Sequence, residues 1–214
     1  MDLDKVVKLL QQTDGRDKIY KFAANFAKIV AWQTADKETA KKWNGLAKSI
    51  GEGRSLMRMG KWVGNASKIQ AVGAKITTLN QRGLVELLRV IGDFGYIFGD
   101  NLAYLGKYNI LPVDAKSAGK NSKVFQFWGY VCAVILDVWS LILLPTKGLD
   151  EKTLQKERTA LILSFTKNAA DMMSTLASVG YLKGFGYDPS TGFTAACGAT
   201  SGAIATYTNW TKLK

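Results

Sequence analysis

The 214-residue sequence contains no histidine and only two cysteines. Without histidine the chain lacks the commonest general base, the commonest zinc ligand and the Ser-His and Cys-His nucleophile pairs. Cys132 and Cys197 each lie in an apolar segment without CxxC spacing, so we interpret both as small apolar residues. Walker A, GxSxG and dinucleotide-binding GxGxxG motifs are also missing. The sequence therefore predicts a protein that is not an enzyme and holds no metal or cofactor.

Proline is equally scarce, since it occurs only at Pro112, Pro145 and Pro189. The long intervals between the prolines carry helical rather than alternating periodicity. Apolar residues between Ile19 and Val30, for example, recur with the spacing of an amphipathic helix of about four turns. An all-α fold follows from these patterns.

Positive charge is abundant and unevenly distributed. The chain has 29 Lys and Arg against 17 Asp and Glu, a net charge of +12. Residues 1–124 hold 21 basic and 11 acidic residues (+10), whereas 125–214 hold 8 and 6 (+2). We therefore divide the chain into a basic region of amphipathic helices (1–124) and a helical region of low net charge (125–214). The charge suits a polyanionic partner, either an anionic phospholipid membrane or a nucleic acid.

Segment 54–76 has the most regular pattern in the sequence and is predicted to form one amphipathic helix. Its predicted basic face consists of Arg54, Arg58, Lys61, Lys68 and Lys75. Its predicted apolar face consists of Met59, Trp62, Val63, Ile69, Val72 and Ile76. A helix of this kind can lie in a membrane interface, where apolar burial and attraction to anionic lipid add together. The alternative is a bundle helix whose polar face is basic.

Segment 125–144 is a candidate membrane span. Its twenty residues reach about 30 Å as a helix, which is the thickness of the hydrocarbon core. Asp137 is its only charged residue and costs a few kcal/mol in mid-membrane unless it faces protein or water. A buried core helix is the alternative.

Segment 192–210 has no charged residue and is rich in small side chains. Gly198 and Gly202 form a GxxxG pair that allows helices to approach closely in lipid, so we expect both glycines to pack against another helix. A Gly/Ala-rich loop is the alternative. Segments 90–111 and 159–182 are each compatible with an interfacial helix or a polar-faced span, and two and four spans both place the termini on one side.

A soluble nucleic-acid-binding protein is a further alternative, because basic residues alternate with Trp32, Trp43 and Trp62. Base stacking would require the aromatic and basic residues to share one surface. In 54–76 they fall on opposite predicted faces, which argues against nucleic acid as the partner.

Three motifs resemble the peroxin-11 family of peroxisomal and glycosomal membrane proteins. They are QTDGRDKIY (12–20), RSLMRMGK (54–61) and GDNLAYL (99–105). The small-residue segment 192–210, followed by Lys212, is similar to the C-terminal end of this family. The motifs occur in the family's order through essentially the whole chain.

The resemblance implies an integral membrane protein of peroxisomes or glycosomes with both termini in the cytosol. Region 1–124 is then expected to face the cytosol, and region 125–214 to anchor the chain in the membrane. The family elongates and proliferates the organelle by inserting an amphipathic helix into the cytosolic leaflet and by self-association as a homo-oligomer. Fission then follows through a dynamin-like GTPase and its membrane adaptor. The inserting helix carries over onto Arg54, Arg58 and Lys61, with Met59, Trp62 and Val63 on its apolar side.

Our leading hypothesis is thus a non-enzymatic membrane-remodelling protein. A solute pore is the second hypothesis, because Asp100, Asp137, Lys167 and Asp171 would line a watery seam if four segments cross the membrane. Internal pairing of these residues between helices is the plainer interpretation.

Overall fold

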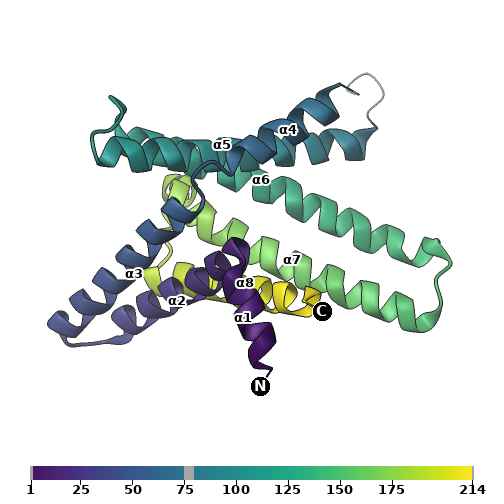
Figure 1. Ribbon diagram of the computed structural model, residues 1–214, viewed down its shortest axis with the longest axis horizontal. Coiled ribbons are helices and arrows are strands. Elements are labelled where there is room, and N and C mark those ends of the chain that lie inside the picture. Colours follow the sequence, from purple (N-terminus) through teal and green to yellow (C-terminus); the bar gives the residue numbers. More distant parts are fainter. Residues whose placement is uncertain (1, 75–79, 214) are drawn as a thin grey trace. The chain divides into compact units, whose positions relative to one another are not determined.

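A computed structural model describes residues 2–74 and 80–213 (Figure 1). The described residues form eight α-helices and two short 3-10 helices and contain no strand, which confirms the all-α prediction. The elements are α1 (Leu3–Gln11), α2 (Thr13–Gln33), α3 (Lys37–Met57), α4 (Trp62–Gly73), α5 (Gln81–Lys107), α6 (Ala115–Leu143), η2 (Leu144–Lys147), α7 (Glu151–Val179), η3 (Tyr181–Phe185) and α8 (Thr191–Lys212).

Short polar side chains cap the first turn of α3, α5, α6, α7 and α8. Asp36, Asn80, Asp114, Asp150 and Ser190 each accept a hydrogen bond from a backbone N–H in the first turn of the helix that follows. Such caps satisfy donors that the helix itself leaves free. All three prolines fall in the connecting segments or in η2, outside the α-helices, as the sequence predicts.

The chain forms two compact units. The first unit comprises the residues up to Arg58 together with those from Gly180 onward, and the second unit runs from Met59 to Val179. The predicted boundary between residues 124 and 125 coincides with neither end of the second unit. It lies inside α6. Charge content therefore does not mark a boundary between compact units.

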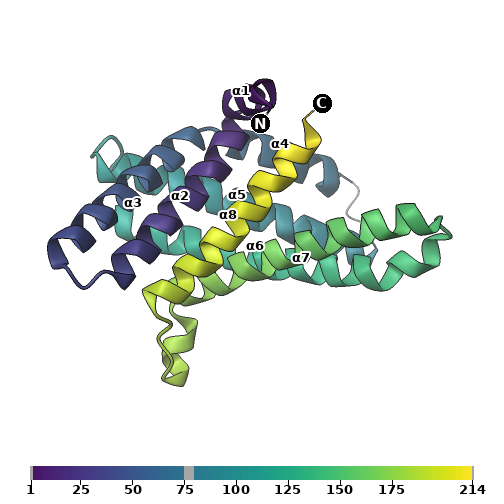
Figure 2. The same cartoon turned by 90° about the horizontal axis from the view of Figure 1, so that it is seen from below.

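In the first unit, α2 is the central helix. It packs against α3, from which a three-residue connector separates it, and against α8, which lies along it (Figure 2). In the second unit, α5 and α6 form the closest pair, with α4 packed on α5 and α7 on α6. A Cβ added at Gly92 of α5 would lie only 2.6 Å from the Gly129 Cα of α6, so glycine is required where these backbones meet.

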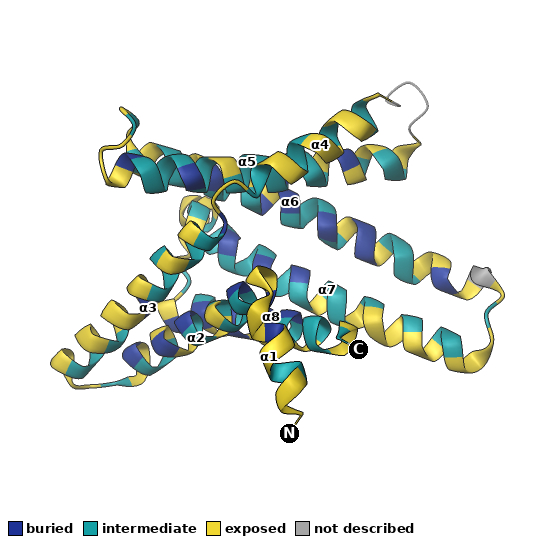
Figure 3. Ribbon diagram, in the orientation of Figure 1, coloured by how far each residue is buried: buried dark blue, intermediate teal, exposed yellow. Residues whose placement is uncertain are grey.

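Buried residues are scattered among intermediate and exposed ones along the helices (Figure 3), and they include polar as well as apolar side chains. The largest fully buried side chains among the described residues are all polar: Asn168, Asp17, Ser122 and Ser201. Large exposed apolar side chains follow α6 at steps of three, seven, three and four residues, namely Phe125, Trp128, Ile135, Val138 and Ile142. These five side chains lie on one face of the helix, and we call this face the α6 apolar stripe.

Candidate functional site

The predicted single helix over 54–76 is wrong. Helix α3 ends at Met57 and α4 begins at Trp62, with a turn between them. Gly60 in this turn has φ = 76°, a left-handed conformation that glycine adopts without the steric cost paid by other residues. The backbone N–H of Gly60 donates to Asn101 Oδ1 of α5 at 3.1 Å, which fixes the start of α4.

Two residues of the predicted basic face bind an internal carboxylate. Asp17 of α2 is only 2% exposed and accepts hydrogen bonds from Arg54 Nε at 3.0 Å and Arg58 Nη1 at 3.2 Å. Lys18 Nζ lies 3.1 Å from the other carboxylate oxygen. Arg58 is itself buried. These two arginines therefore hold α3 to α2, and we remove them from the proposed membrane-binding face.

The electrostatics of this cluster favour the charged form of Asp17. Burial alone raises the pKa of a carboxyl, but the charges of Arg54, Lys18 and Arg58 lower it by more. The pKa of Asp17 consequently lies well below its usual range. The cluster is thus an ionised, interior pairing of two helices.

The predicted apolar face of 54–76 is divided in the structure. Trp62 packs edge-on against the rings of Phe94 and Phe98 on α5, with ring centroids 6.3 and 5.5 Å apart. Ile69 and Val72 are half-buried, whereas Met59 and Val63 are exposed. No residue of α4 is fully buried, and among the described elements α4 packs mainly on α5. Helix α4 is therefore held at its start by one aromatic cluster and by one hydrogen bond from the Gly60 backbone to the Asn101 side chain.

The remaining basic residues of the predicted face differ in position. Lys61 is half-buried in the turn, and Lys68 is exposed on α4. Lys75 and Ile76 lie outside the described residues. Whether these residues meet a membrane stays a prediction.

The candidate span 125–144 is contained almost entirely in α6. This is the one helix of the described chain that is long and apolar enough to cross a membrane, by length and composition. Asp137 is 7% exposed and accepts hydrogen bonds from Ser164 Oγ at 2.9 Å and Asn168 Nδ2 at 2.6 Å, both on α7. Asp137 thus faces protein, as a charged residue in a membrane helix is expected to do.

The other residues of the predicted watery seam lie at different depths. Asp171 is buried, and Asp100 and Lys167 are half-buried. Among the described residues, no group of three or more His, Cys, Asp or Glu side chains is arranged to hold a metal ion.

Gly198 and Gly202 lie where α8 contacts α2. A Cβ added at Gly198 would be 2.5 Å from the Asn25 Oδ1, and one added at Gly202 would be 2.8 Å from the Phe22 backbone nitrogen. Segment 192–210 is helical within α8, so the loop alternative is wrong.

Several residues that build these contacts were not predicted. They are Asp17, Phe94, Phe98, Asn101, Ser164 and Asn168. Two of them lie in motifs that resemble the peroxin-11 family: Asp17 in QTDGRDKIY and Asn101 in GDNLAYL. The sequence carried no signal for the other four.

The described residues thus form an all-α protein with several inward-facing polar groups and one helix that is long and apolar enough to cross a membrane. The chain belongs to the Peroxisomal biogenesis factor 11 (PEX11) family, whose model matches residues 3–210. The resemblance seen in the sequence is therefore confirmed, and the chain is a peroxisomal membrane protein of a family involved in peroxisome biogenesis.

The relatives are distant but cover most of the chain. A Peroxisomal membrane protein 11 homolog of Dictyostelium discoideum is 26% identical over 83% of this chain and 69% of its own. Peroxisomal biogenesis factor 11 of Schizosaccharomyces pombe is 24% identical over 96% of this chain and 93% of its own. Peroxisomal membrane protein 11A of Arabidopsis thaliana is 24% identical over 94% and 89%. These names describe membrane proteins and biogenesis factors, not enzymes. No solved structure matches the chain.

Proposed function

We propose that this chain is an integral protein of the peroxisomal or glycosomal membrane that bends the membrane and thereby drives elongation and proliferation of the organelle. The observation that carries the proposal is the distribution of apolar and polar side chains around α6. The α6 apolar stripe faces outward, while Asp137 and its partner Asn168 face inward. This is the arrangement expected of a helix surrounded by lipid.

The stripe supports the proposed membrane residence energetically. Each of its five side chains is between 40% and 68% exposed. Removing the exposed part of such a side chain from water stabilises the protein by about 1 kcal/mol. The buried hydrogen bonds to Asp137 avoid the cost that an unpartnered carboxylate would impose in the hydrocarbon core.

The membrane-bending element in this proposal is α4. In the docked form its apolar side chains, led by Trp62, contact α5. The same side chains gain a comparable apolar environment if α4 leaves α5 and enters the cytosolic leaflet. The exposed Lys68 and the neighbouring Lys61 favour the inserted form where the leaflet is anionic. A wedge about 5–10 Å deep expands one leaflet relative to the other and curves the bilayer.

The remaining steps are carried over from the family resemblance. Both termini lie in the cytosol, and self-association concentrates the inserted helices. A dynamin-like GTPase and its membrane adaptor then complete fission.

Reconstituted vesicles test the role of α4. We expect full-length protein to tubulate anionic vesicles and the Lys61→Glu/Lys68→Glu variant to leave them round under electron microscopy. Each cation contributes about 1 kcal/mol near an anionic surface, so losing two shifts the equilibrium between inserted and docked α4 about 30-fold toward the docked form. The matched control is Lys41→Glu/Lys48→Glu, which makes the same charge change at the same spacing on α3, where both lysines are exposed. Equal tubulation by the two variants would contradict the assignment to α4.

Alkaline carbonate extraction tests membrane residence separately. An integral protein stays in the pellet, whereas the nucleic-acid-binding alternative predicts protein in the supernatant. The pore alternative predicts a conductance in planar bilayers that responds to Asp137→Asn. We favour remodelling because Asp137 is buried and hydrogen-bonded to α7.

A further inference from the structure

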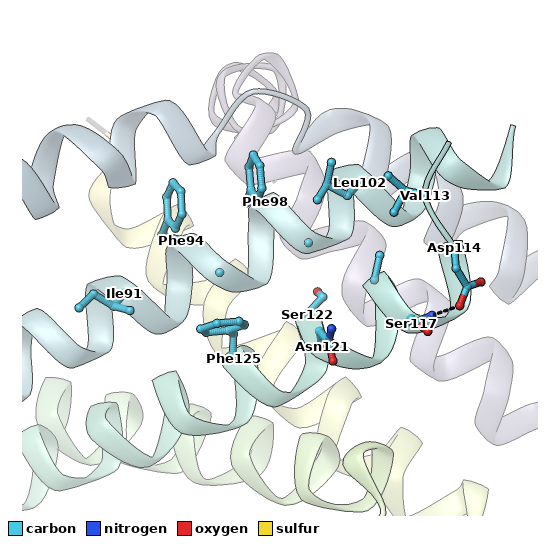
Figure 4. A pocket seen from close by; sticks show the side chains of 13 residues that line it. Ile91, Phe94, Phe98, Leu102, Val113, Asp114, Ser117, Asn121, Ser122 and Phe125 are labelled. Atoms are coloured by element: carbon cyan, nitrogen blue, oxygen red, sulfur yellow. Dashed lines mark hydrogen bonds between the residues drawn. The ribbon is translucent and has the colours of Figure 1, made fainter. Parts of the chain in front are cut away.

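The connection between α7 and α8 exposes aromatic side chains. Phe185 is 87% exposed, more than any other large apolar side chain among the described residues, and Tyr187 is 57% exposed. Phe94 and Phe98 of α5, by contrast, stack on each other and line a groove between α5 and α6 (Figure 4). We call residues 180–189, which include η3, the aromatic loop.

Backbone hydrogen bonds give the aromatic loop a defined shape. Three N–H groups donate to carbonyl oxygens within it at 3.0–3.1 Å: Lys183 to Gly180, Gly186 to Lys183 and Tyr187 to Leu182. Gly180 and Gly186, on either side of η3, have φ of 82° and 77°, which glycine adopts without the steric cost paid by other residues. Figure 2 shows the loop extending beyond the start of α8. The loop is therefore a built turn that holds Phe185 outward.

The aromatic loop lies in a long stretch of low charge. Between Met172 and Trp210 the only charged residues are Lys183 and Asp188, although charged residues make up 21% of the whole chain. Lys183 Nζ lies 3.1 Å from Asp188 Oδ2, so these two charges neutralise each other. The loop consequently has no net charge with which to attract an acidic or a basic partner. Charged residues that enter a membrane characteristically pair with one another in this way.

We propose that the aromatic loop inserts into the interface of a phospholipid membrane, with Phe185 deepest and Tyr187 at the level of the head groups. Tyrosine suits that level because its ring is apolar while its hydroxyl group stays hydrated. A neutral, aromatic surface fits lipid better than it fits a nucleic acid or a charged protein, either of which would require unpaired charge on the loop. This inference rests on the proposed residence in a membrane, and it adds a contact with lipid that is independent of α4.

A nitroxide probe on Gly184→Cys tests the insertion in the full chain with Cys132 and Cys197 replaced. Position 184 has open space around it, so the probe leaves the aromatic side chains in place. The protein is reconstituted into vesicles of phosphatidylcholine alone. Paramagnetic relaxation by oxygen, which concentrates in the bilayer, is compared with relaxation by a water-soluble nickel chelate. We expect oxygen to dominate at position 184 and the nickel chelate to dominate at Gln155→Cys, an exposed position among the charged residues of α7.

A second variant tests whether the ring of Phe185 drives the insertion. Removing a phenyl ring from an apolar environment weakens insertion about tenfold, so in Phe185→Ser the ratio of oxygen to nickel relaxation at position 184 should fall toward the value at position 155. Leu46→Ser, which removes another exposed apolar side chain of the first unit, should leave the ratio unchanged.

Nickel dominance at position 184 in the otherwise unaltered loop, or a ratio insensitive to Phe185→Ser, would overturn the proposal. Flotation of the vesicles separates this failure from failure of the proposed function. Protein that does not float contradicts membrane residence and this inference with it, whereas protein that floats with position 184 in water contradicts the loop inference alone. Because these vesicles contain no anionic lipid, the result is also separate from the tubulation assigned to α4.

Discussion

Replacing Asp17 with asparagine is expected to destabilise the protein more than any single exposed charge change. The substitution preserves the size of the side chain but removes the counter-charge of Arg58, which is buried, and of Arg54. Leaving one member of a buried ion pair without its partner costs about 3–5 kcal/mol in free energy of unfolding. The exposed pair Lys183–Asp188 provides the control, because Asp188→Asn removes a contact worth less than about 1 kcal/mol.

The assay is denaturant or thermal unfolding of the full chain in detergent, followed by circular dichroism. The pH dependence supplies a second signature. Because the pKa of Asp17 is lowered in the folded state, its stabilising contribution is present above the ordinary carboxyl pKa near 3.8 and is lost as the pH falls toward the folded value. Below pH 4 the wild type should therefore lose stability more steeply than Asp17→Asn.

Two results would refute this reasoning. The first is a similar loss of unfolding free energy in Asp17→Asn and Asp188→Asn. The second is an Asp17→Asn/Arg58→Met double variant no more stable than Asp17→Asn, because removing the stranded charge should restore much of the loss.

Three further substitutions test other contacts. Gly202→Leu should lower the free energy of unfolding by about 1–3 kcal/mol because its side chain would collide with the Phe22 backbone, whereas Gly184→Leu, with open space around it, should have little effect. Asp137→Leu should cost about 1–3 kcal/mol because it removes the 2.6 Å acceptor of Asn168 Nδ2 and leaves only the 3.5 Å contact with Ser164 Oγ, and adding Asn168→Leu should recover part of the loss; an additive double variant would contradict this pairing. Gly60→Ala should lower the melting temperature because of its positive φ, while Gly64→Ala within α4 should raise it slightly; the opposite order would contradict the turn geometry.

The helical periodicity and the turn residues predicted much of the fold. The amphipathic pattern over 19–30 lies within α2, the span 125–144 lies almost wholly in α6, and the prolines fall outside the α-helices. These features depend on local chemistry, since side-chain spacing and missing N–H groups act within a few residues.

Such local patterns could not predict the contact partners of the site residues. Arg54 and Arg58 have helical spacing, yet their carboxylate lies 37 and 41 residues away at Asp17. Trp62 belongs to an apolar face, but periodicity does not distinguish a face that meets lipid from one that meets Phe94 and Phe98. Both surroundings are apolar, so only the folded chain identifies the contact.

The decisive question is whether α4 leaves α5 and enters the membrane. It can be answered with a fluorescent probe attached at Ile69→Cys, on the half-buried side of α4, or at Ser67→Cys, on its exposed side, in a chain with Cys132 and Cys197 replaced. In vesicles containing anionic lipid with brominated acyl chains, we expect strong quenching of the probe at position 69 and little at position 67. An unquenched probe at position 69, or equal quenching at both positions, would contradict the claim.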